Sequence, residues 1–293
     1  MKNTNTKNAN TNIASTLLAH PEIRADQSIE LLKRLHILTR DGKLNQDSRR
    51  KLKQVYHLYQ FIEKILNDLD GDITLADHGA GKSYLGFIIY DLFFKSREAT
   101  NDAGSVYGIE ARADLVEKSQ ALAALLGFDR MHFFNMSVAM AAADAKLPAT
   151  FDIVTALHAC DTATDDAIAF GLAKRAKYMV LVPCCQAEIA RALNADKARA
   201  LSHSPLAELW RHPLHTREMG AQITNVLRCL FLEASGYQVT VTELVGWEHS
   251  LKNELILAKH IGKPNRNAAT RLRSILESFG LGELLTTRYK LVS

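Results

Sequence analysis

The chain has 293 residues, of which 47% are hydrophobic, and its formal net charge is +4 at pH 7. This is enough apolar material for one large domain or a domain with appendages, and the four cysteines are too few for a disulfide framework. No apolar run reaches the roughly 18 residues of a membrane helix and no signal peptide is evident, so we expect a cytoplasmic protein without a membrane partner.

The first 70 residues precede any strand-like pattern. Residues 1–12 are rich in Asn, Thr and Lys, which predicts a disordered tail. Residues 13–70 show helical periodicity, with a turn at Asp41-Gly42, and we expect an N-terminal helical segment. The basic cluster Arg49–Lys53 fits either a solvated helix face or an RNA contact.

From residue 71 to residue 262 apolar strand-like runs alternate with helical patterns, which predicts one α/β domain. The predicted strands are 73–77, 105–110, 131–135, 151–157, 178–183, 237–244 and 254–259. The predicted helices are 83–95, 112–126, 136–146, 164–175 and 213–234. The fold class is therefore a Rossmann-like, mostly parallel seven-stranded sheet with helices on both faces, an N-terminal helical extension and a helical tail at 263–293.

A glycine-rich turn follows the first predicted strand, and it admits several ligands. A dinucleotide fingerprint would need a third glycine where Tyr84 stands. A P-loop would use Gly81-Lys82-Ser83, but Ala76 replaces its first glycine. The adenosine-type cofactor S-adenosylmethionine would use Asp77 together with the glycines, and a tight turn without a ligand is the remaining alternative.

The second strand favours the adenosine-type cofactor. It ends in Glu110, where a carboxylate can accept hydrogen bonds from both ribose hydroxyls. A P-loop protein has no need of that acid, and would instead want an aspartate after four apolar residues for magnesium. The candidate run for such an aspartate, residues 151–157, is followed by His158 instead.

Titratable residues also follow the fourth and fifth strands, where ligands of parallel sheets bind. Helix capping explains part of the loop after the fourth strand but does not explain His158 and Asp161. After the fifth strand come Cys184 and Cys185, for which a zinc site shared with Cys160 and His158, a thiolate nucleophile or pocket packing are all considered. A cluster around Trp210 fits a substrate-facing lid or a polar loop; it contains His203, His212 and His215.

These stretches together resemble a known family of class I methyltransferases. The segments Asp77–Leu85, Leu157–Asp161 and Pro183–Cys185 are similar to its glycine turn, its leucine–histidine–x–cysteine loop and its proline–cysteine–cysteine strand end. The segment Trp247–Leu255 resembles its late E-H-[ST]-x-K-N motif, and the likeness covers roughly residues 51–259. The loop 158–165 is also similar to that of tRNA acceptor-stem 2′-O-methyltransferases, although Asp161 replaces a glycine and their zinc modules are missing from the sequence.

The resemblance implies an S-adenosyl-L-methionine-dependent methyltransferase whose methyl acceptor is unidentified, with RNA favoured. We expect His158 and then Asp161 to act as the catalytic base, and no metal site is predicted. The predicted cofactor-binding residues are Asp77, His78, Gly79, Gly81, Lys82, Tyr84, Glu110, Ala111, Met136 and His158. The alternatives are a P-loop-like nucleotide-binding protein, a non-catalytic RNA-binding protein on the same fold, and a cofactor-binding protein that has lost its substrate; the oligomeric state stays open.

Overall fold

The computed structural model describes residues 20–97, 104–157, 159–184, 186–195, 208–209, 211–244 and 254–291. Several sequence predictions lie outside the described residues: the tail 1–12, His158, Cys185, His203, Trp210 and the late motif up to residue 253.

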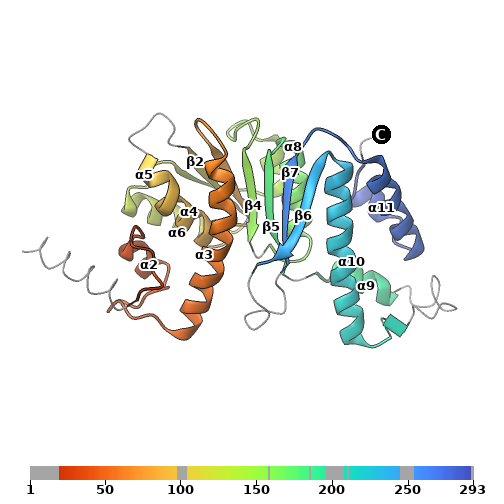
Figure 1. Ribbon diagram of the computed structural model, residues 1–293, viewed down its shortest axis with the longest axis horizontal. Coiled ribbons are helices and arrows are strands. Elements are labelled where there is room, and N and C mark those ends of the chain that lie inside the picture. The colour runs from red at the N-terminus through yellow and green to blue at the C-terminus, as the bar shows by residue number, and fades with distance from the viewer. Residues whose placement is uncertain are drawn as a thin grey trace, which may run out of the picture. The chain divides into compact units, whose positions relative to one another are not determined.

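Strands and helices alternate along the chain as predicted (Figure 1). The strands are β1 (Thr74–His78), β2 (Ser105–Glu110), β3 (Met131–Asn135), β4 (Ile153–Leu157), β5 (Tyr178–Val182), β6 (Tyr237–Glu243) and β7 (Glu254–His260). The helices before β4 are α2 (Ile29–Arg34), α3 (Gln46–Asn67), α4 (Tyr84–Ile89), the π-helical segment η1 (Tyr90–Phe94), α5 (Lys95–Arg97), α6 (Ala113–Leu126) and α7 (Val138–Ala143). Those after β4 are α8 (Ala163–Ala173), α9 (Glu188–Ala195), α10 (Pro213–Ala234), α11 (Arg266–Ser278) and α12 (Leu284–Thr287).

The seven strands form a mixed sheet in the order β3-β2-β1-β4-β5-β7-β6. The pairs β1–β2, β2–β3 and β4–β5 are parallel, whereas β7 runs antiparallel to both β5 and β6. This confirms the predicted fold class, a mostly parallel Rossmann-like sheet closed by a late antiparallel strand.

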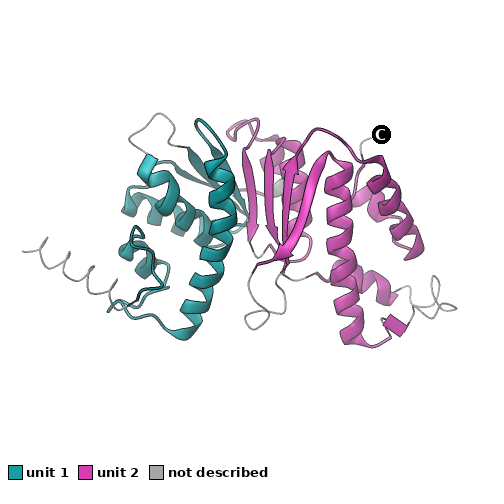
Figure 2. Cartoon of the chain, in the orientation of Figure 1, with its two compact units in different colours: residues 1–135 teal, residues 136–293 magenta. Residues whose placement is uncertain are grey.

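The chain divides into two compact units, residues 1–135 and 136–293 (Figure 2). The sequence-based domain boundaries after residues 12, 70 and 262 stay predictions.

In the first unit the helical extension is attached through a buried carboxylate. The side chain of Asp91, in the π-helical segment, accepts hydrogen bonds from the Gln27 side-chain amide and, at 2.7 Å, from the Ser28 backbone N–H. Lys95 Nζ lies 3.2 Å from the same carboxylate. Because Ser28 is also the N-cap of α2, this one acid fixes the start of that helix on the domain.

The second unit is built around its longest helix. α10 packs on β6, α9 and α11, and α8 packs on β4 and β5. The α10 side chain of Arg228 is fully buried, and Tyr237 Oη donates a 2.7 Å hydrogen bond to the Ala176 carbonyl. A buried arginine requires compensating acceptors, and these are the Asp165 carboxylate in the first turn of α8, the Asp161 carbonyl and the side chain of Asn225 in α10.

Two local features differ from the predicted helices. The predicted helix 83–95 contains the π-helical segment η1. The sequence did not indicate it, because the residues of η1 are all buried and a continuous apolar run has no periodicity that distinguishes a π-helix from an α-helix. The eight-residue α9 was not predicted; its first N–H groups are satisfied by an acid far away in the sequence, described below. Among the described residues, no helix is both long and apolar enough to cross a membrane.

Candidate cofactor site at the ends of the strands

The glycine turn after β1 adopts left-handed backbone conformations at three positions. Gly79, Gly81 and Ser83 have φ of 65°, 57° and 50°. The Gly79 N–H donates to the Ile109 carbonyl at 2.9 Å, which attaches the turn to the neighbouring strand β2. Residues other than glycine rarely adopt the left-handed backbone conformation. The path of the turn therefore favours glycine at positions 79 and 81.

Asp77 organises the turn from within the core. It is 3% exposed, and its Oδ2 accepts a 3.0 Å hydrogen bond from Ser83 Oγ. A Cβ on Gly86 would lie 2.6 Å from that hydroxyl and 3.2 Å from the carboxylate, so α4 can approach only without a side chain there. A P-loop would present the serine hydroxyl to magnesium, whereas here it is buried against the acid. This geometry argues against the phosphate-cradle alternative.

Glu110 faces the glycine turn from the end of β2. Its Oε2 accepts from the Gly81 N–H at 2.8 Å, and its Oε1 accepts from the backbone N–H and Nε of Arg112 at 3.0 and 3.2 Å. Burial opposes ionisation, but the hydrogen bonds from Arg112 and Gly81 outweigh it and lower the pKa of the carboxyl. The group is therefore ionised near neutral pH, and carboxylate oxygens with remaining lone pairs can accept from hydroxyls.

The neighbouring strand end completes this edge. Asn135 at the end of β3 donates from Nδ2 to the carbonyls of Glu110 and Ala111, at 3.2 and 2.8 Å. Neither Asn135 nor Arg112 is among the predicted site residues. Asn135 could have been found from its position at a strand end, whereas no sequence pattern indicates Arg112.

The other residues predicted to bind the cofactor from the first unit differ in their surroundings. His78 is 4% exposed, and burial lowers its pKa to about 4, so it is neutral at pH 7. Lys82 and Tyr84 line a cavity together with residues of α2 and α6, and neither Asp77 nor Glu110 lines it.

In the second unit, Asp161 anchors the following loop and helix. Its Oδ1 accepts from the N–H groups of Ala187 and Glu188, at 2.9 and 3.1 Å, and its Oδ2 accepts from Arg191 at 2.8 Å. Burial would raise the pKa of this carboxyl, but these hydrogen bonds lower it. A carboxylate so occupied is a weak proton acceptor, and it sits in a left-handed backbone conformation with φ of 52°.

A buried polar network lies behind this loop. Arg228 donates to both oxygens of Asp165, at 2.9 and 2.6 Å, and to the Asp161 carbonyl at 2.8 Å. Asn225 accepts from Gln186 at 3.1 Å and donates to Glu254 at 2.6 Å. The network thus joins the loops after β4 and β5 to the start of β7, which are three of the stretches that carry the family resemblance.

The remaining candidates of the second unit are brought together only in part. Cys160 Sγ lies 3.1 Å from Cys184 Sγ, and Met136 is half-buried. The rings of His212 and His215 meet edge to face at 5.4 Å. Within the parts of the chain that the structure describes, no three His, Cys, Asp or Glu residues are grouped to hold a metal ion; His158 and Cys185 lie outside those parts.

Comparisons with known proteins identify the domain. Residues 50–192 match a protein family described as "Methyltransferase domain". No protein with a curated description matches the chain.

Solved structures with a similar sheet are remote. A magnesium protoporphyrin IX methyltransferase from Synechocystis with bound SAH is 12% identical, over 84% of this chain and 99% of that chain, with a TM-score of 0.44. A SAM-dependent methyltransferase from Aquifex aeolicus is 17% identical, over 74% and 98%, with a TM-score of 0.39. An rRNA methylase from Streptococcus thermophilus is 8% identical, over 69% and 95%, with a TM-score of 0.40.

The residues at the ends of β1 and β2 fit the cofactor of such a domain. The glycines of the left-handed turn carry no side chain that would block a ligand, and the ionised Glu110 is a candidate acceptor for ribose hydroxyls. The methyltransferase domain matched over residues 50–192 and the seven-stranded, mostly parallel sheet together support an S-adenosyl-L-methionine-dependent methyltransferase.

Proposed function

We propose that the chain transfers the methyl group of S-adenosyl-L-methionine to RNA. The observation that supports the cofactor part is the 2.8 Å hydrogen bond from the Gly81 N–H to the Glu110 carboxylate, which brings the glycine turn and the proposed ribose acceptor together. The RNA acceptor is supported by the basic net charge and by the loop similar to that of tRNA 2′-O-methyltransferases.

The residues of the first unit would hold the cofactor. Glu110 would accept hydrogen bonds from the ribose hydroxyls, and Gly79 and Gly81 would let backbone approach the methionine portion. Asp77 would act mainly by fixing the turn through Ser83, because its carboxylate is buried there. Ala111, directly after Glu110, would lie beside the bound nucleoside. When bound, the cofactor supplies the activated methyl group.

The acceptor needs to lose a proton if it is a hydroxyl or an amine, and His158 is the proposed base. It follows β4 directly, and a neutral histidine near pH 7 can accept the proton. We assign Asp161 to positioning the loop 184–188, because its carboxylate oxygens already accept three hydrogen bonds. A cytoplasmic location fits these roles.

A methyl-transfer assay tests the acceptor. The protein is incubated with tritiated S-adenosylmethionine and with separate RNA and protein fractions of a cell extract. We expect label in the RNA fraction that ribonuclease releases and protease does not. Label only in protein would refute the RNA acceptor, and no label with intact cofactor binding would favour the non-catalytic RNA-binding alternative.

His158→Ala tests the base. We expect kcat to fall by about 100-fold or more while the affinity for S-adenosylhomocysteine is kept, since general bases contribute roughly 10²–10⁴-fold. An unchanged kcat would remove His158 from the mechanism.

A further inference from the structure

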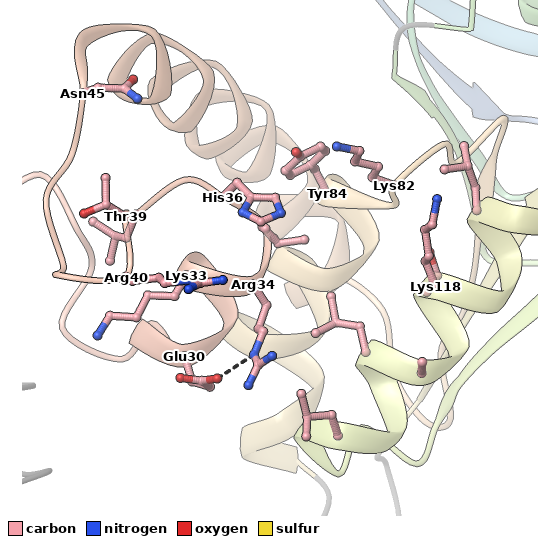
Figure 3. A pocket seen from close by; sticks show the side chains of 17 residues that line it. Glu30, Lys33, Arg34, His36, Thr39, Arg40, Asn45, Lys82, Tyr84 and Lys118 are labelled. Atoms are coloured by element: carbon pink, nitrogen blue, oxygen red, sulfur yellow. Dashed lines mark hydrogen bonds and ion pairs between the residues drawn. The ribbon is translucent and has the colours of Figure 1, made fainter.

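The first unit contains a cavity of about 1090 Å³ that the cofactor contacts described above do not use. Its lining comes from α2, the turn after α2, the glycine turn and α6 (Figure 3). The apolar part of the lining includes Leu35, Leu38 and Leu115, all buried. Because Lys82 and Tyr84 belong to the lining, the cavity adjoins the turn that would hold the cofactor.

The cavity is strongly cationic. Five lysine or arginine side chains line it, against a single carboxylate; they are Lys33, Arg34, Arg40, Lys82 and Lys118, with Glu30. The excess of positive charge on this one lining equals the net charge of +4 that the whole chain carries. Concentrated charge of one sign marks a surface for a polyanion more clearly than net charge does.

Three of these cations have no acidic partner among the residues that the structure describes. Arg34 pairs with Glu30 at 2.7 Å and Lys118 with Asp114 at 3.0 Å, as exposed i,i+4 pairs. Across the described ranges, no carboxylate lies within ion-pair distance of the other three, which are Lys33, Arg40 and Lys82.

The basic cluster on α3 shows the contrast. Arg49 pairs with Glu22 at 3.0 Å and Lys51 pairs with Asp47 at 2.9 Å. The sequence suggested this cluster as an RNA contact, but two of its positive charges form ion pairs with carboxylates of the protein. On the cavity, by contrast, three cations have no acidic partner among the described residues.

Aromatic rings accompany the cations. Tyr84 and His36 both line the cavity, and Figure 3 shows them with Lys82 at its upper part. His36 has a left-handed backbone conformation with φ of 55°, which is unusual for a residue with a side chain. Proteins bind single-stranded nucleic acid with cationic side chains that contact the phosphates and aromatic rings that stack on the bases.

We propose that this cavity binds the backbone of single-stranded RNA, with Lys33 and Arg40 on phosphates and Tyr84 under a base. The proposal deepens the proposed function and rests on it in taking the occupant to be the methyl acceptor. Among polyanions, RNA is favoured over an acidic peptide because a peptide of carboxylates would not use the rings.

The test is fluorescence anisotropy with a labelled single-stranded RNA of about 16 nucleotides. The double variant Lys33→Glu/Arg40→Glu is compared with Arg266→Glu/Arg273→Glu, which makes the same charge change on α11 at exposed positions outside the lining. We expect the cavity variant to lose at least about tenfold in RNA affinity and the control to change little. The slope of log K against log salt should fall by about 1.4 for two lost contacts, at roughly 0.7 per phosphate on a single strand. Lys33→Gln/Arg40→Gln gives a milder change that keeps the test valid if charge reversal unfolds the protein.

The outcomes separate this inference from the proposed function. Equal RNA affinity in the cavity variant and wild type, or no RNA binding by wild type, overturns the inference. Polyglutamate that binds as tightly as RNA and depends on Lys33 and Arg40 assigns the cavity to an acidic protein and also overturns it. S-adenosylhomocysteine affinity is measured in the same samples: RNA bound through the cavity by a protein that does not bind the cofactor product supports this inference and refutes the proposed function.

Discussion

Polar residues follow buried strands in both units, but their hydrogen-bond partners differ between the units. After β1 and β2 of the first unit, Glu110 is ionised beside a turn whose glycines leave the backbone accessible. After β4 of the second unit, Asp161 and Asp165 are occupied by the N-terminus of α9 and by Arg228. The same sequence signal, an acid near a strand end, thus belongs to the proposed ligand site in one unit and to structural anchors in the other.

The largest expected effect is on the anchor of the second unit. Arg228→Met leaves Asp165 as a buried charge without its partner, and we expect the free energy of unfolding to fall by about 3–5 kcal/mol. The matched control is Arg271→Met on α11, whose pair with Glu233 is exposed and should contribute at most about 1 kcal/mol. Urea unfolding measures both. Equal, small losses would show that the buried pair does not hold this unit together.

A second test concerns the buried histidine of the first unit. Its folded pKa of about 4 lies below the ordinary 6.5, so the unfolded chain takes up a proton first as the pH falls. His78 therefore contributes full stability above pH 6.5 and loses about 3 kcal/mol of it as the pH falls towards 4. In His78→Gln this loss disappears. The difference between the unfolding free energies of wild type and variant, measured from pH 7 to pH 4, should shrink with acid, and a constant difference would contradict the burial of this ring.

A smaller effect is expected at Asp161. Asp161→Asn removes the charge from hydrogen bonds to α9, which should cost about 1–3 kcal/mol of stability. The pH profile of kcat/KM should keep its shape, since the residue positions the loop. A loss of kcat above about 100-fold with unchanged stability would restore Asp161 as the catalytic base.

Local pattern predicted most of the fold. The bounds of β2, β3 and α10 agree with the sequence analysis residue for residue, because alternation, glycines and Pro213 are all local signals. The glycine turn and Glu110 were found for the same reason: the turn chemistry and the strand end are both readable from adjacent residues.

The rest depends on contacts between residues far apart in the sequence. The cap of α9 is supplied by Asp161, 26 residues before it, so no window around 188 could indicate a helix start there. The cavity likewise combines Lys33 with Lys118, which no periodicity connects. The sequence instead suggested the contiguous basic cluster on α3 as an RNA contact, although two of its charges, Arg49 and Lys51, are paired.

The most direct test of the comparison is isothermal titration of S-adenosylhomocysteine into wild type, Glu110→Gln and Asp114→Asn. Both variants remove one negative charge near the start of α6, but Asp114 is exposed and paired with Lys118. We expect Glu110→Gln to bind at least about tenfold more weakly, since hydrogen bonds to charged groups contribute roughly 1.5–3 kcal/mol, and Asp114→Asn to bind as wild type does. Unchanged affinity in Glu110→Gln, or binding of ATP with magnesium in place of S-adenosylhomocysteine, would contradict the assignment of this strand end to the cofactor.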